Sequence, residues 1–170
     1  MVTKLDRPNG LNVVAGLVVV AASLLLAGAV SAEETDDRLA AFKLFTNCEA
    51  FNLRVGGLHP IADDINLSRE SLMATAKGRL NDVRLYDPEA DTYLFINVNL
   101  TSEAFDIIMA LKKHLHDEYS GERRPATTWA TGATGTHGGT SDSILASIDG
   151  FMDEFLAEFQ LVNQHACNQR

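Results

Sequence analysis

The chain contains two cysteines, Cys48 and Cys167, whose number and placement favour a single structural disulfide. They lie near opposite ends of the region that follows an N-terminal apolar segment. A bridge between them would close a loop of about 120 residues, worth about 5 kcal/mol in the chain-entropy model. A redox-active pair normally has a short Cys-x-x-Cys spacing, which this sequence lacks. We therefore predict a structural bridge; a redox pair or two unbridged buried thiols are the alternatives.

Histidines offer a second kind of chemistry. His114 and His116 are two residues apart, so on a strand both imidazoles would point to the same face. His137, His59 or Asp117 could supply a third ligand, which would complete a zinc site with one open position for water. Such a site would make the protein a small metal-dependent hydrolase. The simpler interpretation, which we favour, is that His114 and His116 are solvated side chains on a polar face.

A third candidate is the glycine- and threonine-rich stretch at residues 131–139, which contains His137. Glycines let backbone N–H groups converge on an anion, and a helix is expected to begin just after it, near Ser141. No Gly-Lys-Ser/Thr follows, so the stretch is not a Walker loop. It could make the protein a carrier of a small ligand, or it could simply connect a strand to a helix.

Periodicity predicts the elements that position these residues. Alternating apolar residues indicate strands at 48–56, 92–100 and 104–116, and a further strand is expected around Trp129, at 126–131. Ser68 can cap a helix that should run to about residue 84, and Leu67 and Leu72 would form a hydrophobic staple around its first turn. Residues 132–140 are expected to form a loop, and a long helix should follow at 141–165. The apolar stripe along one side of that helix is predicted to contain Ile144, Ile148, Phe151, Phe155, Phe159 and Val162.

Two segments leave alternatives open. Residues 38–45 could form a short helix or a strand. Residues 104–116 contain good helix formers near residue 112, but their period of two and the short link to the preceding strand favour a hairpin.

The element order β-α-β-β-β-α predicts an α+β fold. We expect one domain at residues 33–170, with a four-stranded, mostly antiparallel sheet and both helices on one face. The other face would carry Tyr93, Phe95 and Ile108 among polar residues, with no helix left to cover it. Such a half-apolar face could bind a partner, pair with a second copy or pack under the N-terminal segment. Trp129 is expected in the core, with a stacking role as the alternative.

Residues 1–32 have the features of a signal peptide. Lys4 and Arg7 precede an apolar run at 13–27, and small residues end at Ala32, where a signal peptidase would cut. The run is shorter than the roughly 20 apolar residues of a membrane span. Because thiols form bridges in oxidising compartments, an exported chain fits the predicted disulfide. We expect no stable membrane anchor after cleavage.

The formal net charge is −9, which disfavours binding to nucleic acid or to anionic lipid. We find no basic stripe with interleaved aromatic residues and no Gly-x-Ser-x-Gly nucleophile motif.

The C-terminal half carries a further pattern. Thr128-Trp129 is followed by the glycine-rich stretch, then by Phe155-Leu156-Ala157-Glu158-Phe159, Val162-Asn163 and Cys167, and Arg79 and Arg84 precede it. The pattern resembles small exported bacterial proteins of unknown function. This resemblance implies a periplasmic setting and a bridged α+β domain, and it transfers no catalytic residues. Arg79 and Arg84 would then be structural, offering guanidinium groups to the many carboxylates.

These observations lead to one functional prediction. We expect an exported, periplasmic or secreted, non-enzymatic domain that needs no cofactor and binds a protein or another component of the cell envelope. The candidate binding residues are Tyr93, Phe95, Ile108, Trp129 and His137. The metal-dependent hydrolase based on His114, His116 and His137 and the small-ligand carrier remain the alternatives.

Overall fold

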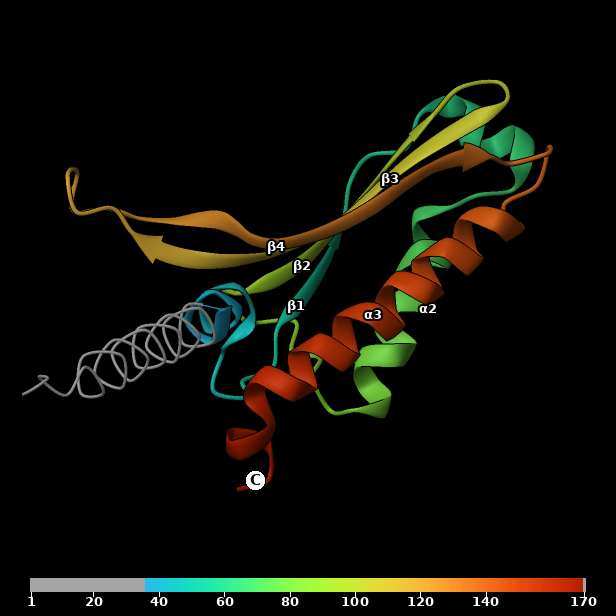
Figure 1. Ribbon diagram of the computed structural model, residues 1–170. Helices are drawn as coiled ribbons and strands as arrows, with labels where there is room; N and C mark the ends of the chain where they lie inside the picture. Colours follow the sequence, from blue (N-terminus) through green and yellow to red (C-terminus); the bar gives the residue numbers. More distant parts are fainter. Residues whose placement is uncertain (1–35, 170) are drawn as a thin grey trace, which may run out of the picture. The chain divides into compact units, whose positions relative to one another are not determined.

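Four strands form one sheet in the spatial order β1-β2-β3-β4 (Figure 1). They are β1 (Asn52–Val55), β2 (Tyr93–Leu100), β3 (Ala104–His116) and β4 (Arg123–Thr136). β1 and β2 are parallel, and the β2–β3 and β3–β4 pairs are antiparallel. The structure is a computed structural model that describes residues 36–169. The predicted signal peptide therefore lies outside the described residues.

Two α-helices cover one face of the sheet (Figure 1). α2 (Arg69–Asp82) packs on β1, and α3 (Asp142–Cys167) packs on β3, β4 and α2. A short 3-10 helix, Pro60–Ile65, precedes α2. The predicted α+β class, the element order and the mostly antiparallel sheet are confirmed, and so is the Cys48–Cys167 disulfide.

The start of α2 follows the predicted capping pattern. The Ser68 hydroxyl accepts a hydrogen bond from the Ser71 backbone N–H at 3.0 Å, and the Ser71 hydroxyl accepts one from the Ser68 N–H at 3.2 Å. This reciprocal pair satisfies two donors that the first helical turn leaves free. Leu67 and Leu72, the residues of the predicted staple, are both buried.

The core lies between the helices and the inner face of the sheet. Phe51, Trp129, Phe155 and Phe159 form an aromatic cluster in which three ring pairs meet edge to face, with centroids 5.1–5.5 Å apart. Such pairs each contribute about 0.5–1.5 kcal/mol beyond the area they bury. The buried stripe of α3 includes Met152 and Asn163 in place of the predicted Phe151 and Val162, which are only half-buried.

β4 is longer than predicted, because it continues through the stretch that was expected to be a loop. Glycine is needed there for close contact with β3. A Cβ atom on Gly132 would lie 2.4 Å from the Ile107 carbonyl oxygen, and one on Gly135 would lie 2.8 Å from the Phe105 ring. The loop at 132–140 is therefore corrected: it begins only after Thr136.

β1 is shorter than the predicted strand at 48–56. Asn47 and Cys48 both adopt left-handed backbone conformations, with φ of 58°, and extended pairing cannot begin until the chain has left them. Phe51 makes only an isolated bridge to Tyr86. Residues 36–44 are helical, which decides between the two structures considered for that segment.

The β3–β4 hairpin extends beyond the rest of the sheet. Pairing of β2 with β3 ends at Lys112, whereas β3 and β4 stay paired as far as His116 and Arg123. A register shift after Leu111 lies where this two-stranded ribbon begins. Within the described part of the chain, no helix is both long and apolar enough to span a membrane.

The close approach at Gly132 makes a testable prediction. Gly132→Ala should destabilise the domain by about 1–3 kcal/mol, because the added methyl group meets a backbone oxygen that cannot move freely. Gly150→Ala is the matched control: its Cβ meets nothing within 4 Å and it lies inside α3, so it should stabilise by up to about 1 kcal/mol. Urea unfolding of both variants measures the difference, and equal effects would contradict this explanation.

Candidate functional site

The outer face of the sheet, which points away from α2 and α3, brings together three of the five candidate binding residues. Leu94 and Ile96 are buried under the helices, so strand alternation places Tyr93 and Phe95 on the outer face, and the β2–β3 register adds Ile108. The two central rows across the sheet are Arg54, Phe95, Ala110 and Ala130, followed by Asn97, Ile108 and Gly132.

Ile108 is the most exposed large apolar side chain on this outer face among the described residues. Its exposed fraction is 45%, and its partner on β4 is Gly132, which has no side chain to cover it. Ala110, one row away, is buried under its neighbours. Phe95, Ala110 and Ile108 therefore form an apolar centre without a charged side chain, as expected for a contact surface. The Asn97 amide lies beside this centre, and Arg54 lies at its β1 edge.

Polar interactions fix both ends of the outer face. At one end the Arg54 guanidinium lies 3.9 Å from the centroid of the Tyr93 ring. Lys112 is the partner of Tyr93 on β3, and its ammonium donates to the Thr127 hydroxyl at 2.7 Å. At the other end the Asn99 amide donates to the Asp106 carboxylate at 3.3 Å. The apolar centre thus has basic groups on one side and an acidic group on the other.

Trp129 lies on the inner face, in the core. Its ring packs edge to face on Phe155, and its indole N–H donates to the Glu158 carboxylate at 2.8 Å. The expectation of a core position is confirmed, and Trp129 does not belong to the outer face.

His137 ends β4 and has a structural environment. Its side chain is 5% exposed; Nε2 lies 3.2 Å from the Thr101 carbonyl oxygen, and Nδ1 accepts from the Gly139 N–H at 3.2 Å. These contacts use both ring nitrogens and join the β2–β3 turn to the loop before α3. His137 therefore does not reach the outer face either.

His114 and His116 lie at the far end of the hairpin from His137. Ala104 pairs with Thr136 beside His137, whereas His116 pairs with Arg123, so almost the whole 13-residue β3 separates them. At about 3.3 Å per residue this is roughly 40 Å. The three histidines do not form one site, and the described residues include no cluster of three or more possible metal ligands.

Side-chain contacts hold the ribbon at its base and at its tip. The Lys113 ammonium donates to the carbonyl oxygens of Phe42 and Phe45, and burial lowers the pKa of Lys113. At the tip the Asp117 carboxylate accepts from the Ser120 hydroxyl and the Tyr119 N–H, and these bonds lower the pKa of Asp117. Tyr119 itself is fully exposed.

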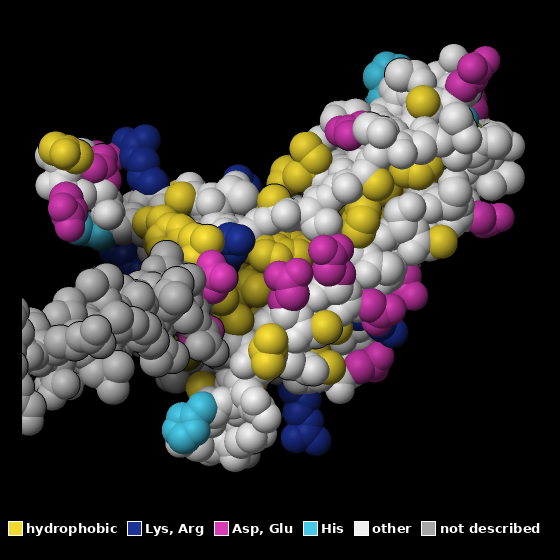
Figure 2. Space-filling model, in the orientation of Figure 1, with side chains coloured by type: hydrophobic (Ala, Val, Ile, Leu, Met, Phe, Trp, Pro, Cys, Tyr) yellow, Lys and Arg dark blue, Asp and Glu magenta, His cyan; other side chains and the backbone are white. Residues whose placement is uncertain are grey.

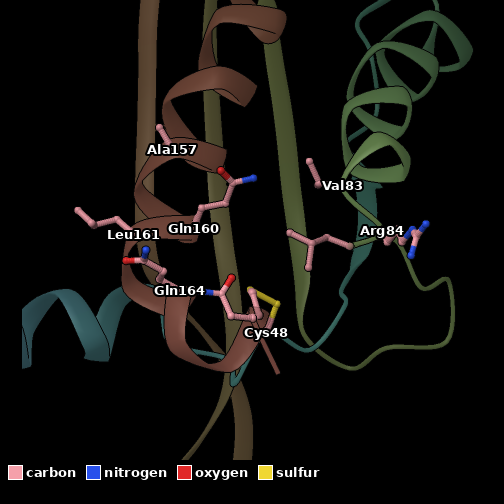
Figure 3. Close-up of a pocket in the computed structure, with 10 residues that line it drawn as sticks. Cys48, Val83, Arg84, Ala157, Gln160, Leu161 and Gln164 are labelled. Carbon is pink, nitrogen blue, oxygen red and sulfur yellow. A yellow bond between two sulfur atoms is a disulfide. The ribbon is translucent and has the colours of Figure 1, made fainter. Parts of the chain in front are cut away.

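A groove that the sequence did not predict lies beside the disulfide (Figure 3). It has a volume of about 780 Å³ and lies between the C-terminal ends of α2 and α3. Its lining is apolar and amide-rich, with one cation and no carboxylate: Cys48, Val83, Arg84, Leu85, Ala157, Gln160, Leu161, Gln164, Cys167 and Asn168. Figure 3 shows Gln160 and Val83 on opposite sides of it. The sequence offered one indication of this groove: Leu161 is a large apolar residue that lies outside the predicted apolar stripe of α3.

Asn163 positions the wall of this groove. Its amide oxygen accepts from the N–H groups of Thr46 and Cys48 at 3.0 and 3.2 Å. Its amide nitrogen donates to the carbonyl oxygens of Leu44 and Phe159 at 3.0 and 2.9 Å. All four hydrogen-bonding positions of a fully buried amide are thus used. Cys167 follows one helical turn after Asn163, where it meets Cys48.

Arg84 ends α2 in a conformation that usually requires glycine. Its φ is 59°, its N–H bonds to the Asn81 carbonyl oxygen, and the next N–H, of Leu85, bonds to the Leu80 carbonyl oxygen. This is a Schellman motif with arginine at the left-handed position. The strain at Arg84 falls on a residue that lines the groove.

Acidic side chains follow the exposed side of α3 (Figure 2). Two of them, Asp149 and Asp153, pair with Arg79 of α2 and join the two helices. The structural role that the resemblance implied therefore applies to Arg79. Arg84 lies at the groove, and no described carboxylate forms an ion pair with it.

Comparisons with known proteins add little to this geometry. No protein-family model matches the chain, and no curated protein matches it. Among solved structures, the crystal structure of a minor lipoprotein from Acinetobacter baumannii aligns with 69% of this chain and 94% of that chain. The identity is 12% and the TM-score is 0.24, so the similarity supports no conclusion about this chain.

Asn163→Asp should destabilise the domain by about 3 kcal/mol or more at neutral pH. The substitution turns two donated hydrogen bonds into contacts between oxygens and buries a charge. Burial raises the pKa of such a carboxyl above its unfolded value of about 4. The loss relative to wild type should therefore be smallest below pH 4, grow as the pH rises from about 4 to the folded pKa, and stay constant above it.

Gln164→Glu, which makes the same change on an exposed neighbour, is the control and should have little effect. Urea unfolding at several pH values measures both variants. A pH-independent loss in Asn163→Asp would count against the hydrogen-bond assignment.

Arg84→Gly should raise stability by about 0.5–1 kcal/mol, because glycine adopts the left-handed conformation without strain. Asp82→Gly, within the last turn of α2, should instead lower stability by a similar amount. Thermal unfolding distinguishes the two variants. If Arg84→Gly lowered the melting temperature, the contacts of the Arg84 side chain would stabilise the domain by more than its left-handed backbone conformation destabilises it.

Proposed function

We propose that this chain is an exported binding domain whose outer sheet face takes up a protein partner in the cell envelope. One observation carries the proposal: Ile108 is exposed at the centre of the sheet face that points away from α2 and α3. A side chain of that size, 45% exposed between Ala110 and Gly132, gains most from burial against another surface.

The disulfide supports a location outside the cytoplasm. Cys48 and Cys167 are bridged, and such bridges persist mainly in oxidising compartments. The predicted signal peptide points to the same place, the periplasm or the exterior of the cell. A domain that is stabilised by a disulfide in that compartment can present a binding surface there.

The charges of the outer face suggest the chemistry of the partner. Arg54 and Lys112 lie at one end of the apolar centre and Asp106 at the other. A complementary surface carries an apolar strip with a carboxylate near the first end and a cation near the second. The net charge of −9 makes nucleic acid and anionic lipid poor competitors.

Binding accounts for the site better than catalysis does. His137 holds two turns together, and His114 and His116 lie roughly 40 Å of strand away from it. A hydrolase based on these three side chains would need them within reach of one metal ion.

Capture of envelope proteins by the tagged, disulfide-bonded domain tests the proposal. Ile108→Asp and Phe95→Asp should each abolish capture of the partner, because a buried, unpaired carboxylate in a contact surface costs several kcal/mol. Tyr119→Asp, at the fully exposed tip of the hairpin, is the matched control and should retain it.

Each variant must keep its melting temperature and its bridge, so that loss of capture reports on the surface. Proteins captured equally well by Ile108→Asp and by wild type would show that the outer face is not the binding site.

A further inference from the structure

The two edges of the sheet are protected to different extents. An exposed edge strand offers unpaired N–H and C=O groups to other chains, and proteins usually shorten, charge or cover such edges. β1, at one edge, has only four residues. β4, at the other edge, has 14 residues, and within the described part of the chain it pairs with β3 alone.

The first part of β4 carries several protective features. Arg123 and Arg124 place two charges there, and Pro125 removes a backbone donor. The register shift near Thr128 interrupts the regular edge, and the Thr128 hydroxyl donates to the Lys43 carbonyl oxygen, which brings another segment against the strand.

The second part of β4, residues 130–136, has none of these features. Its sequence is Ala-Thr-Gly-Ala-Thr-Gly-Thr, with no charge and no proline. Its side chains are small, so another strand can approach without steric conflict. Among the described residues its backbone pairs along its length with β3, and the Ser143 hydroxyl donates to the Thr136 carbonyl oxygen. The Thr131 hydroxyl also donates to the Glu154 carboxylate, a side-chain contact that does not use the backbone of the strand.

We propose that two copies of this chain associate through residues 130–136, which pair antiparallel with the same residues of the second copy. Antiparallel self-pairing has two-fold symmetry, so one contact closes the dimer. The segment is centred on Ala133, so pairing over its full length sets Ala133 opposite Ala133 of the second copy. Every other pair joins alanine, threonine or glycine, and no like charges meet.

The dimer would contain one continuous sheet of two copies of β1–β4. The outer faces of the two copies would then adjoin across β4, with Ala130 and Gly132 of each next to the junction. Electrostatics oppose the association, since each copy has a net charge of −9 and Glu154 hydrogen-bonds to Thr131 beside the junction. Salt screens such repulsion, so added salt should strengthen the dimer.

Cysteine cross-linking tests the predicted register. In an antiparallel pair, opposite Cα atoms are about 4.5–5.5 Å apart, within the range that a disulfide spans. Ala133→Cys should therefore form a covalent dimer on mild oxidation, with the Cys48–Cys167 bridge intact by peptide mapping. Ala146→Cys, which is exposed on α3, should remain monomeric under the same conditions.

Sedimentation across a concentration series tests the edge itself. Thr134→Lys should weaken the dimer by about tenfold or more, because a lysine on the edge disfavours pairing. Ala146→Lys, with the same change in charge away from β4, should leave it unchanged or slightly stronger.

Three outcomes would overturn the proposal: a wild-type chain that stays monomeric at every concentration and salt, a dimer that Ala133→Cys does not cross-link, or equal cross-linking at Ala133 and Ala146.

Discussion

A single buried amide, that of Asn163, connects the parts of this domain that lie farthest apart in the sequence. Its four hydrogen bonds hold the turn at residues 44–48, which contains two consecutive left-handed residues, against the last turns of α3. Cys167, one helical turn after Asn163, forms the disulfide with Cys48 of this segment. Without a partner for each polar group, burying the amide would cost stability, so the arrangement forms as a whole or not at all.

This connection commits both helices to one side of the sheet. α2 and α3 pack together over β1, β3 and β4, and Arg79 links them through Asp149 and Asp153. The inner face is consequently a closed aromatic and aliphatic core. The outer face keeps Ile108 exposed, and β4 keeps an uncharged edge. The outer face and the β4 edge remain available for binding because both helices pack on the inner face.

Local patterns were sufficient for several elements and insufficient for others. The alternation at 104–116 and the capping pattern at Ser68 predicted β3 and α2 because the signal lies within each segment. The end of β4 was missed because threonine and glycine are typical of loops, whereas their strand conformation here depends on contact with Ile107 and Phe105. The groove was missed because residues near 84 and 160 meet only in the folded chain.

The sequence by itself determined the α+β class and the shared face of Tyr93, Phe95 and Ile108, because the alternation of apolar residues within each strand carries that information. It also determined the pairing of the cysteines, because a chain with two cysteines can form only one intramolecular disulfide. Only the tertiary structure decided that His137 lies far from His114 and His116, and that Asn163 is buried. These outcomes depend on strand register and on helix packing, in which each residue's position is set by partners distant in the chain.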